Sequence, residues 1–138
     1  MKTFFSKIVE LRVRYSETDQ MGYCYYGNYA QYFEIGRVEA LRVVGMSYKS
    51  LEEQGYMLPV STMDVQYKAP AKYDDLLEIE TKITEMKGAR LIFNYAIRIE
   101  DRIIATGNTT LVFVSKDDMR PTQPPSGFTQ LLSKYEEI

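Results

Sequence analysis

The segment from Tyr15 to Tyr29, YSETDQMGYCYYGNY, holds residues whose types and spacing suit chemistry. It contains two carboxylates, Glu17 and Asp19, and the only cysteine of the chain, Cys24. The chain has no histidine, so neither Ser-His-Asp nor Cys-His catalysis is available within it. Histidine-based zinc sites are excluded for the same reason, and we expect no metal. Any acid–base step must therefore use Asp, Glu, Lys, Tyr or Cys24.

The residues alone leave two interpretations of Asp19. Its carboxylate can act as a base or nucleophile, or it can close an Asx-turn that shapes the loop before Gly22, and the residue types favour the turn. For Glu17 we expect a solvated loop carboxylate, and it is the second candidate for a base. Cys24 has no imidazole and no adjacent cation in the sequence, so we expect a protonated thiol that packs as a small buried residue.

A long helix is predicted directly after this segment. Asn28 suits the N-cap position and Gly45 the position just beyond the last helical residue, so we expect a helix over residues 29–44. Its apolar residues cover about half of the circumference, which is wider than the apolar face of an ordinary surface helix. We therefore expect other structure to wrap most of this helix.

Most of the remaining chain alternates between apolar and polar residues, as half-buried strands do. Gly107 interrupts the last alternating run, which predicts a bulge or a close approach of another element there. A second helix is expected to be capped by Ser47. The expected strands are 7–15, 58–67, 77–83, 91–99 and 103–114, and the expected short helices are 48–54 and 128–135.

This order of elements predicts the fold class. One strand precedes the long helix, and four strands joined by short connections follow it. Short connections favour antiparallel neighbours. We expect an α+β protein in which a curved antiparallel β-sheet wraps around one long central helix, with residues 1–138 forming a single domain.

Composition excludes several classes of function. The net charge of −2 argues against nucleic acid as the main partner, because phosphate binding leaves a basic surface. No stretch approaches the roughly 20 apolar residues of a membrane span. The first residues lack the apolar run and cleavage site of a signal peptide. Together with the single cysteine, these features lead us to expect a cytoplasmic protein.

Several motifs resemble the hotdog-fold 4-hydroxybenzoyl-CoA thioesterase-like family, which includes the acyl-CoA thioesterases associated with the Tol–Pal system. The first motif is YSETDQMG at 15–22, and YYGNY at 25–29 leads into the helix. The resemblance continues through Phe33 and Arg37, GYMLPV at 55–60 and YDDL at 73–76. It covers roughly residues 11–114, and the first motif is the most specific part of it.

The resemblance implies a hotdog fold and hydrolysis of acyl-CoA thioesters. It implies that Asp19 does the chemistry, as nucleophile or as general base, and that the backbone N–H of Tyr26 points at the thioester carbonyl. Relatives often have histidine in place of Tyr26, which leaves this backbone role intact. The family needs no cofactor, since coenzyme A is part of the substrate. Its active sites lie between two subunits, so we expect a homodimer or a homotetramer.

The same resemblance, together with position, suggests residues that bind substrate. Glu34 would meet a polar tail or a ring hydroxyl of the acyl group, and a solvated helix carboxylate is an equally good interpretation. Lys87 and Arg90 flank the Gly88 turn, where they would bind the CoA phosphates or simply form a charged hairpin. The remaining candidates, which could equally be packing residues, are Gly22, Tyr25, Gly27, Tyr29, Val60, Ser61 and Met63.

A thioester needs less catalytic help than an amide because it is more electrophilic and has a good leaving group. One carboxylate and hydrogen-bond donors to the carbonyl oxygen can suffice. A thioesterase specific for acyl carrier protein is a close alternative, and it would need a basic docking surface. A non-catalytic acyl-CoA-binding or sensor protein would not need Asp19 as a reactive group. A structural assembly subunit would neither bind nor hydrolyse acyl-CoA. Hotdog dehydratases use histidine, which this chain lacks.

Overall fold

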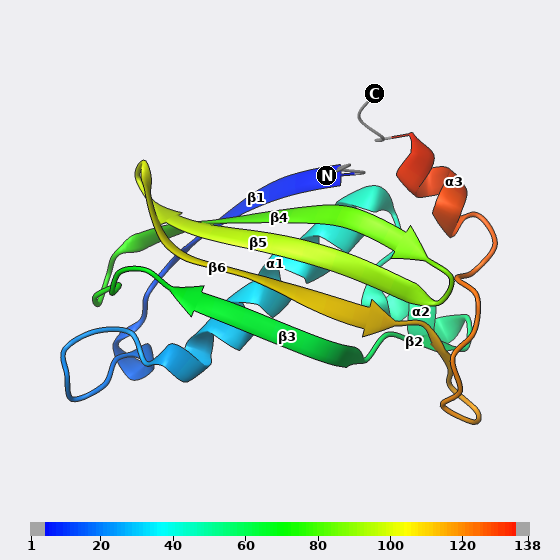
Figure 1. Ribbon diagram of the computed structural model, residues 1–138, viewed down its shortest axis with the longest axis horizontal. Coiled ribbons are helices and arrows are strands. Elements are labelled where there is room, and N and C mark those ends of the chain that lie inside the picture. The colour runs from blue at the N-terminus through cyan, green and yellow to red at the C-terminus, as the bar shows by residue number, and fades with distance from the viewer. Residues whose placement is uncertain (1–4, 135–138) are drawn as a thin grey trace.

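The computed structural model describes residues 5–134, in which a curved sheet wraps around one long helix (Figure 1). The strands are β1 (Phe5–Arg12), β2 (Tyr56–Met57), β3 (Val60–Tyr67), β4 (Leu76–Lys87), β5 (Arg90–Ile99), β6 (Arg102–Val112) and β7 (Val114–Ser115). The α-helices are α1 (Tyr29–Val44), α2 (Tyr48–Glu53) and α3 (Phe128–Ser133), and short 3₁₀ turns span Tyr15–Glu17 and Tyr26–Asn28. The α+β architecture expected from the sequence is therefore confirmed.

The main sheet has five antiparallel strands in the order β1-β4-β5-β6-β3. The strands β1 and β3 are therefore its two edges. The strands β2 and β7 form a separate two-stranded ribbon. Figure 1 shows the loop before α1 at the left end of the sheet and the β4–β5 hairpin at the right end. The predicted catalytic residues, Asp19 and Tyr26, come from the left end, and Lys87 and Arg90 come from the right end.

Two glycines let α1 lie close against the sheet. A Cβ atom at Gly36 would overlap the Thr81 hydroxyl of β4, and one at Gly107 would overlap the ring of Phe33. Phe33 in turn stacks on Tyr95 of β5, with ring centroids 4.2 Å apart. The close approach predicted at Gly107 is confirmed. The packing is tight because a missing side chain on one element makes room for an aromatic ring or a hydroxyl on the other.

Some strand boundaries differ from those predicted. The first strand was expected at 7–15, but β1 begins at Phe5 and ends at Arg12. Strand β4 was expected at 77–83 but runs to Lys87. Its register shifts between Ile83 and Glu85, and this bulge breaks the alternation from which the strand was predicted. The last strand is divided at Phe113, where the chain leaves β6 and pairs with β2 as β7. The predicted helix at 128–135 is α3, and its last predicted residue lies outside the described part of the chain.

Both ends of α1 lie where the sequence predicts them, with Asn28 at the N-cap position and Gly45 just beyond the last helical residue. Gly45 adopts a φ of 99° at the C-terminal end, where a left-handed backbone suits glycine. Asn28 precedes the helix, but its side chain does not cap it. The amide Nδ2 of Asn28 donates instead to the backbone carbonyl of Glu17, at 2.7 Å. Asn28 therefore ties the helix to the preceding loop. Ser47 caps α2 as predicted, since its hydroxyl accepts from the Ser50 N–H at 3.1 Å.

Within residues 5–134, no helix is both long enough and apolar enough to cross a bilayer.

Candidate active site

The loop before α1 is a small hairpin that presents Asp19. Thr18 and Cys24 form an isolated antiparallel bridge across it. The Asp19 N–H donates to the Tyr23 carbonyl at 3.0 Å, and the Gly22 N–H donates to the Asp19 carbonyl at 3.0 Å. Gly22 has a φ of 88°, a conformation that glycine adopts without strain. The backbone of Asp19 is therefore held on both sides.

The two oxygens of the Asp19 carboxylate have different surroundings. Oδ1 accepts a hydrogen bond from the Met21 N–H at 2.9 Å, so the Asx-turn considered from the sequence is present. Oδ2 is buried and has no hydrogen-bond partner among the described residues. A buried carboxylate oxygen without a partner is unfavourable for folding, so such groups call for a functional explanation. One half of the carboxylate shapes the loop, and the other half is available for chemistry.

The entry to α1 leaves hydrogen-bond donors free. The Tyr25 N–H donates to the Glu17 carbonyl at 2.9 Å, and the Asn28 N–H donates to the Tyr25 carbonyl at 3.0 Å. Neither the Tyr26 N–H nor the Gly27 N–H donates a hydrogen bond within residues 5–134. Free N–H groups at a helix N-terminus, with the positive end of the helix dipole, favour negative charge. This is the backbone group that the sequence resemblance implied for Tyr26.

Glu17 is a buried structural centre of the loop, so the expectation of a solvated carboxylate was wrong. Only 9% of the residue is exposed. Its Oε1 accepts from the Arg14 N–H at 2.8 Å and from the Tyr32 hydroxyl at 3.0 Å. Its backbone carbonyl accepts from both Tyr25 and Asn28. Glu17 thus joins the end of β1, the Asp19 hairpin and α1, and its carboxylate already accepts hydrogen bonds from Arg14 and Tyr32.

Cys24 packs inside this network. The thiol lies 3.3 Å from the Tyr32 hydroxyl, and the residue is buried. Burial raises the pKa of the Cys24 thiol above its ordinary value, and the carboxylates of Glu17 and Asp19 raise it further. The prediction of a buried, protonated Cys24 is confirmed, which makes it a poor nucleophile.

Tyr67 is a residue of this site that the sequence did not reveal. It lies at the end of β3, and its hydroxyl donates to the Tyr26 carbonyl at 3.1 Å. Its ring lies 5.2 Å from that of Tyr29 and 6.2 Å from that of Tyr26, between centroids. A hollow of about 240 Å³ opens among Cys24 and these three tyrosines. Tyr67 pairs with the buried Ala105 and so lies on the inner face of the sheet, but nothing in the sequence placed it beside the helix entry.

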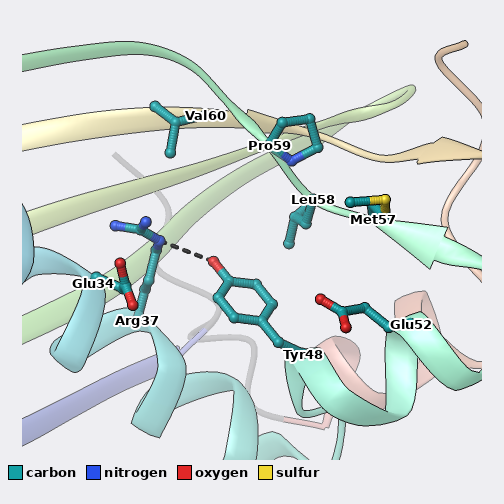
Figure 2. Close-up of a pocket in the computed structure, with 8 residues that line it drawn as sticks. All are labelled: Glu34, Arg37, Tyr48, Glu52, Met57, Leu58, Pro59 and Val60. Carbon is teal, nitrogen blue, oxygen red and sulfur yellow. Dashed lines mark hydrogen bonds between the residues drawn. The ribbon is translucent and has the colours of Figure 1, made fainter. Parts of the chain in front are cut away.

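A second hollow, of about 330 Å³, lies farther along α1 (Figure 2). Arg37 of α1 and Tyr48 of α2 point toward each other in it, and the Arg37 Nε donates to the Tyr48 hydroxyl at 2.9 Å. The hollow, called the Arg37 pocket below, is lined by Glu34, Arg37, Tyr48, Glu52, Met57, Leu58, Pro59 and Val60.

The predicted acyl-binding residues are divided between these places. Val60 and Glu34 line the Arg37 pocket. Met63 pairs with the buried Thr109 and so faces the inner side of the sheet, where α1 lies. The Ser61 hydroxyl donates to the Thr110 carbonyl at 3.1 Å and is used within the sheet. These residues do not cluster around Asp19 of their own chain.

The remaining predicted residues are also spread. Tyr25 lies over Gly27, where an added Cβ would come within 2.6 Å of the tyrosine ring. Lys87 and Arg90 pair across the β4–β5 hairpin and are exposed. They lie at the opposite end of the sheet from the Asp19 hairpin. Ile97 of β5 marks the near end, because it pairs with Ala105, which pairs with Tyr67. Arg90 is seven residues along β5 from Ile97, which is roughly 23 Å.

Comparison with known proteins agrees with this geometry. Residues 13–132 match the thioesterase-like superfamily. The chain belongs to this family. Among its relatives, the acyl-CoA thioester hydrolase YbgC of Escherichia coli is 35% identical over 116 residues, which cover 83% of this chain and 87% of the relative. The acyl-CoA thioesterase YbgC of Haemophilus influenzae is 33% identical over 116 residues, covering 83% of this thioesterase and 85% of the relative.

Solved structures identify the fold of this thioesterase. The DHNA-CoA thioesterase of Staphylococcus aureus superposes with a TM-score of 0.89 at 31% identity, over 94% of this chain and 89% of that chain. The hotdog fold and the thioester-hydrolysing class expected from the sequence are therefore confirmed.

Proposed function

We propose that this thioesterase hydrolyses acyl-CoA thioesters, with Asp19 as the reacting carboxylate and the Tyr26 N–H as donor to the carbonyl oxygen. The buried, unpartnered Oδ2 of Asp19 is the observation that carries the proposal. The names of the relatives support the substrate class, since both YbgC proteins are named for acyl-CoA.

The chemistry follows from the two oxygens of Asp19. The Met21 N–H holds Oδ1, which fixes the orientation of the carboxylate and leaves Oδ2 as the reacting atom. Oδ2 attacks the thioester carbon or removes a proton from the water that does so. The free N–H groups at Tyr26 and Gly27 stabilise the negative charge on the carbonyl oxygen, at about 3 kcal/mol for one such donor. If water attacks, the C–S bond breaks to give the carboxylic acid and the CoA thiol. If Oδ2 attacks, the C–S bond breaks to give the CoA thiol and a mixed anhydride, which water then hydrolyses to the carboxylic acid and free Asp19.

The edge strand β3 supports a dimer. Its inner-face residues are exposed, with 44% of Val60, 47% of Met63 and 52% of Tyr67 accessible. An uncovered edge strand with an apolar face is a site for pairing with another strand. Two copies related by a two-fold axis would pair their β3 strands antiparallel and extend the sheet. If the pairing spans the whole of β3, Tyr67 of one copy lies opposite Val60 of the other.

This pairing gives Lys87 and Arg90 a place near the reaction. Within one chain the hairpin that carries them is at the far end of the sheet. In the dimer, the Val60 end of the second copy lies beside the Tyr67 end of the first. Arg90 pairs with Val112, and the adjacent Leu111 pairs with Val60. Arg90 therefore lies at the same end of the sheet as Val60. The cations of one copy would then bind the CoA phosphates of a substrate held by the other.

The test is thiol release from short, long and aromatic acyl-CoAs by the wild type and by Asp19→Asn. Asparagine keeps the shape of the side chain but loses the charge. We expect turnover to fall about 100-fold or more, with acyl-CoA affinity nearly unchanged. Asp101→Asn, in an exposed turn, is the matched control and should behave as wild type. Equal rates for Asp19→Asn and wild type would exclude the proposed chemistry.

The same assay separates the alternative functions. Binding of acyl-CoA without turnover by the wild type would indicate a binding or sensor protein. Turnover of an acyl group on acyl carrier protein, but not on CoA, would indicate the carrier-protein enzyme.

A further inference from the structure

Arg37 is a buried cation that forms no ion pair with a carboxylate of residues 5–134. Only 8% of the residue is exposed. The ion pairs among residues 5–134 join Arg14 to Glu17, Arg42 to Glu39 and Arg98 to Glu80, and none includes Arg37. Buried charges in proteins are usually paired, because taking a charge out of water is costly. The bond from its Nε to the Tyr48 hydroxyl uses one of five guanidinium N–H donors, and the Tyr95 hydroxyl is a second neighbour of the guanidinium.

The Arg37 pocket can recognise one kind of chemical group. Arg37 supplies only donors, so a ligand that meets it must present an oxygen that accepts hydrogen bonds. Tyr48, Leu58 and Val60 supply carbon surface around the guanidinium (Figure 2). A pocket that combines apolar surface with a few polar groups is the usual form of a small-molecule subsite, and here the carboxylates of Glu34 and Glu52 line it together with Arg37. It would hold the far end of an acyl chain that ends in an oxygen.

Distances indicate that the Arg37 pocket lies next to the active site of the partner subunit in the β3-paired dimer. Arg37 lies eleven residues after Tyr26, which is roughly 16–18 Å along the helix. Along β3, Val60 lies seven residues from Tyr67, or roughly 23 Å. Paired antiparallel strands are only about 5 Å apart, so in the β3-paired dimer the Val60 end of one copy directly adjoins the Tyr67 end of the other.

We propose that Arg37 is a specificity-determining residue that serves the active site of the partner subunit, where it binds an oxygen at the far end of the acyl group. The proposal rests on the proposed function. The register of β3 keeps Val60 on the same inner face as Met63, because one extra residue is inserted between Val60 and Thr62. Opposite residues of an antiparallel pair point to the same side, so Val60 of one copy and Tyr67 of the other would line one continuous wall.

The substrate preference is tested with acyl-CoAs of equal chain length that end in a methyl, a hydroxyl or a carboxylate group. In the wild type we expect kcat/KM for at least one oxygenated chain to exceed that for the methyl chain about tenfold or more. In Arg37→Met this preference should disappear, while the methyl chain is still hydrolysed. The better of the two oxygenated chains identifies the acyl class. A preference for the methyl chain, or one that survives Arg37→Met, would overturn the proposal.

Mixed dimers test which active site the pocket serves. Two chains with different affinity tags are co-expressed and the mixed dimer is purified. One mixed dimer combines Asp19→Asn with Arg37→Met on separate chains, and the other combines a chain that carries both changes with a wild-type chain. The two dimers contain the same substitutions, so a general loss of stability affects both equally.

The two dimers have opposite expected activities on the oxygenated substrate. If Arg37 serves the partner, the dimer with the two changes on separate chains keeps one active site with both Asp19 and Arg37, and about half of the wild-type rate. The dimer with both changes on one chain then keeps no such site. If Arg37 serves its own chain, the result is reversed and the proposal fails. The Asp19→Asn homodimer reports separately on the proposed function, since its full activity would refute the catalytic role of Asp19 whatever the mixed dimers do.

Discussion

The Tyr32 hydroxyl donates to Oε1 of Glu17 at 3.0 Å, and this bond connects the long helix to the hairpin that presents Asp19. Both groups are buried. The contact joins residues fifteen positions apart in the chain. It links the position of the Asp19 carboxylate to that of α1, and therefore to that of the N–H groups at the start of the helix.

Removing this bond should lower both stability and turnover. In Tyr32→Phe, Glu17 loses one partner inside the protein, so we expect the free energy of unfolding to fall by about 1–3 kcal/mol. We expect kcat to fall more than KM rises, because the hairpin still forms but is less well fixed. Urea unfolding and steady-state kinetics measure the two effects. Tyr73→Phe, at an exposed tyrosine, is the control. An unchanged kcat in Tyr32→Phe would show that the bond does not position Asp19.

A charge in the middle of β3 should separate the dimer. Met63 is 47% exposed and faces the inner side of an edge strand. In Met63→Lys, the two lysines would lie close together across the two-fold axis and repel each other. We expect a monomer by light scattering and loss of thioesterase activity with it. Ile103→Lys places the same charge on an exposed residue of β6 and should leave the oligomer intact. A monomeric wild type would contradict the pairing of β3.

Replacing Gly36 with alanine should destabilise the protein, although alanine normally favours a helix. The new Cβ would overlap the Thr81 hydroxyl and lie 3.0 Å from Ile79 Cγ2. We expect a loss of about 1–3 kcal/mol in the free energy of unfolding. Thr81→Ala removes the overlapping hydroxyl, which has no hydrogen-bond partner among the described residues. The double variant should therefore recover most of the loss, and no recovery would place the strain elsewhere.

Cys24 should react slowly with alkylating reagents at neutral pH. Burial raises the pKa of its thiol, so the native protein holds less thiolate at pH 7 than an unfolded chain does. We expect the alkylation rate of the native protein to be well below that of the urea-unfolded protein, and to keep rising with pH beyond the ordinary thiol range. Mass spectrometry follows the reaction directly. Equal rates in the two states would mean that the loop exposes Cys24.

Tyr29 should make the protein sensitive to alkali. Burial raises the pKa of Tyr29 from an ordinary 10.0 to about 12. A pKa raised on folding gives stability that is complete below pH 10 and is lost as the pH rises toward 12. The difference corresponds to about 2–3 kcal/mol. We expect Tm to fall less steeply between pH 9 and 11 in Tyr29→Phe than in the wild type, by about a third at most, because burial also raises the pKa of Tyr32 and of Tyr95.

The sequence by itself predicted the kinds and order of the elements. Period-2 alternation marked the strands, and Gly45 and Ser47 marked helix ends, because these signals depend on neighbours within a few residues. It also indicated the candidate catalytic segment, since the spacing of Asp19, Gly22 and Asn28 is local. The wrong boundary of β4 arose from a bulge, which shifts the alternation without changing the composition.

The tertiary structure alone decided the surroundings of each charged group. Glu17 was expected in water, and the sequence did not predict that Arg37 is enclosed, yet both are buried. Their partners, Tyr32 and Tyr48, come from elements that meet them only after the helices pack on the sheet. Burial and hydrogen bonding depend on contacts between distant segments, and local sequence carries little information about those. The free oxygen of Asp19 became visible for the same reason, since it is defined by what the folded chain does not place beside it.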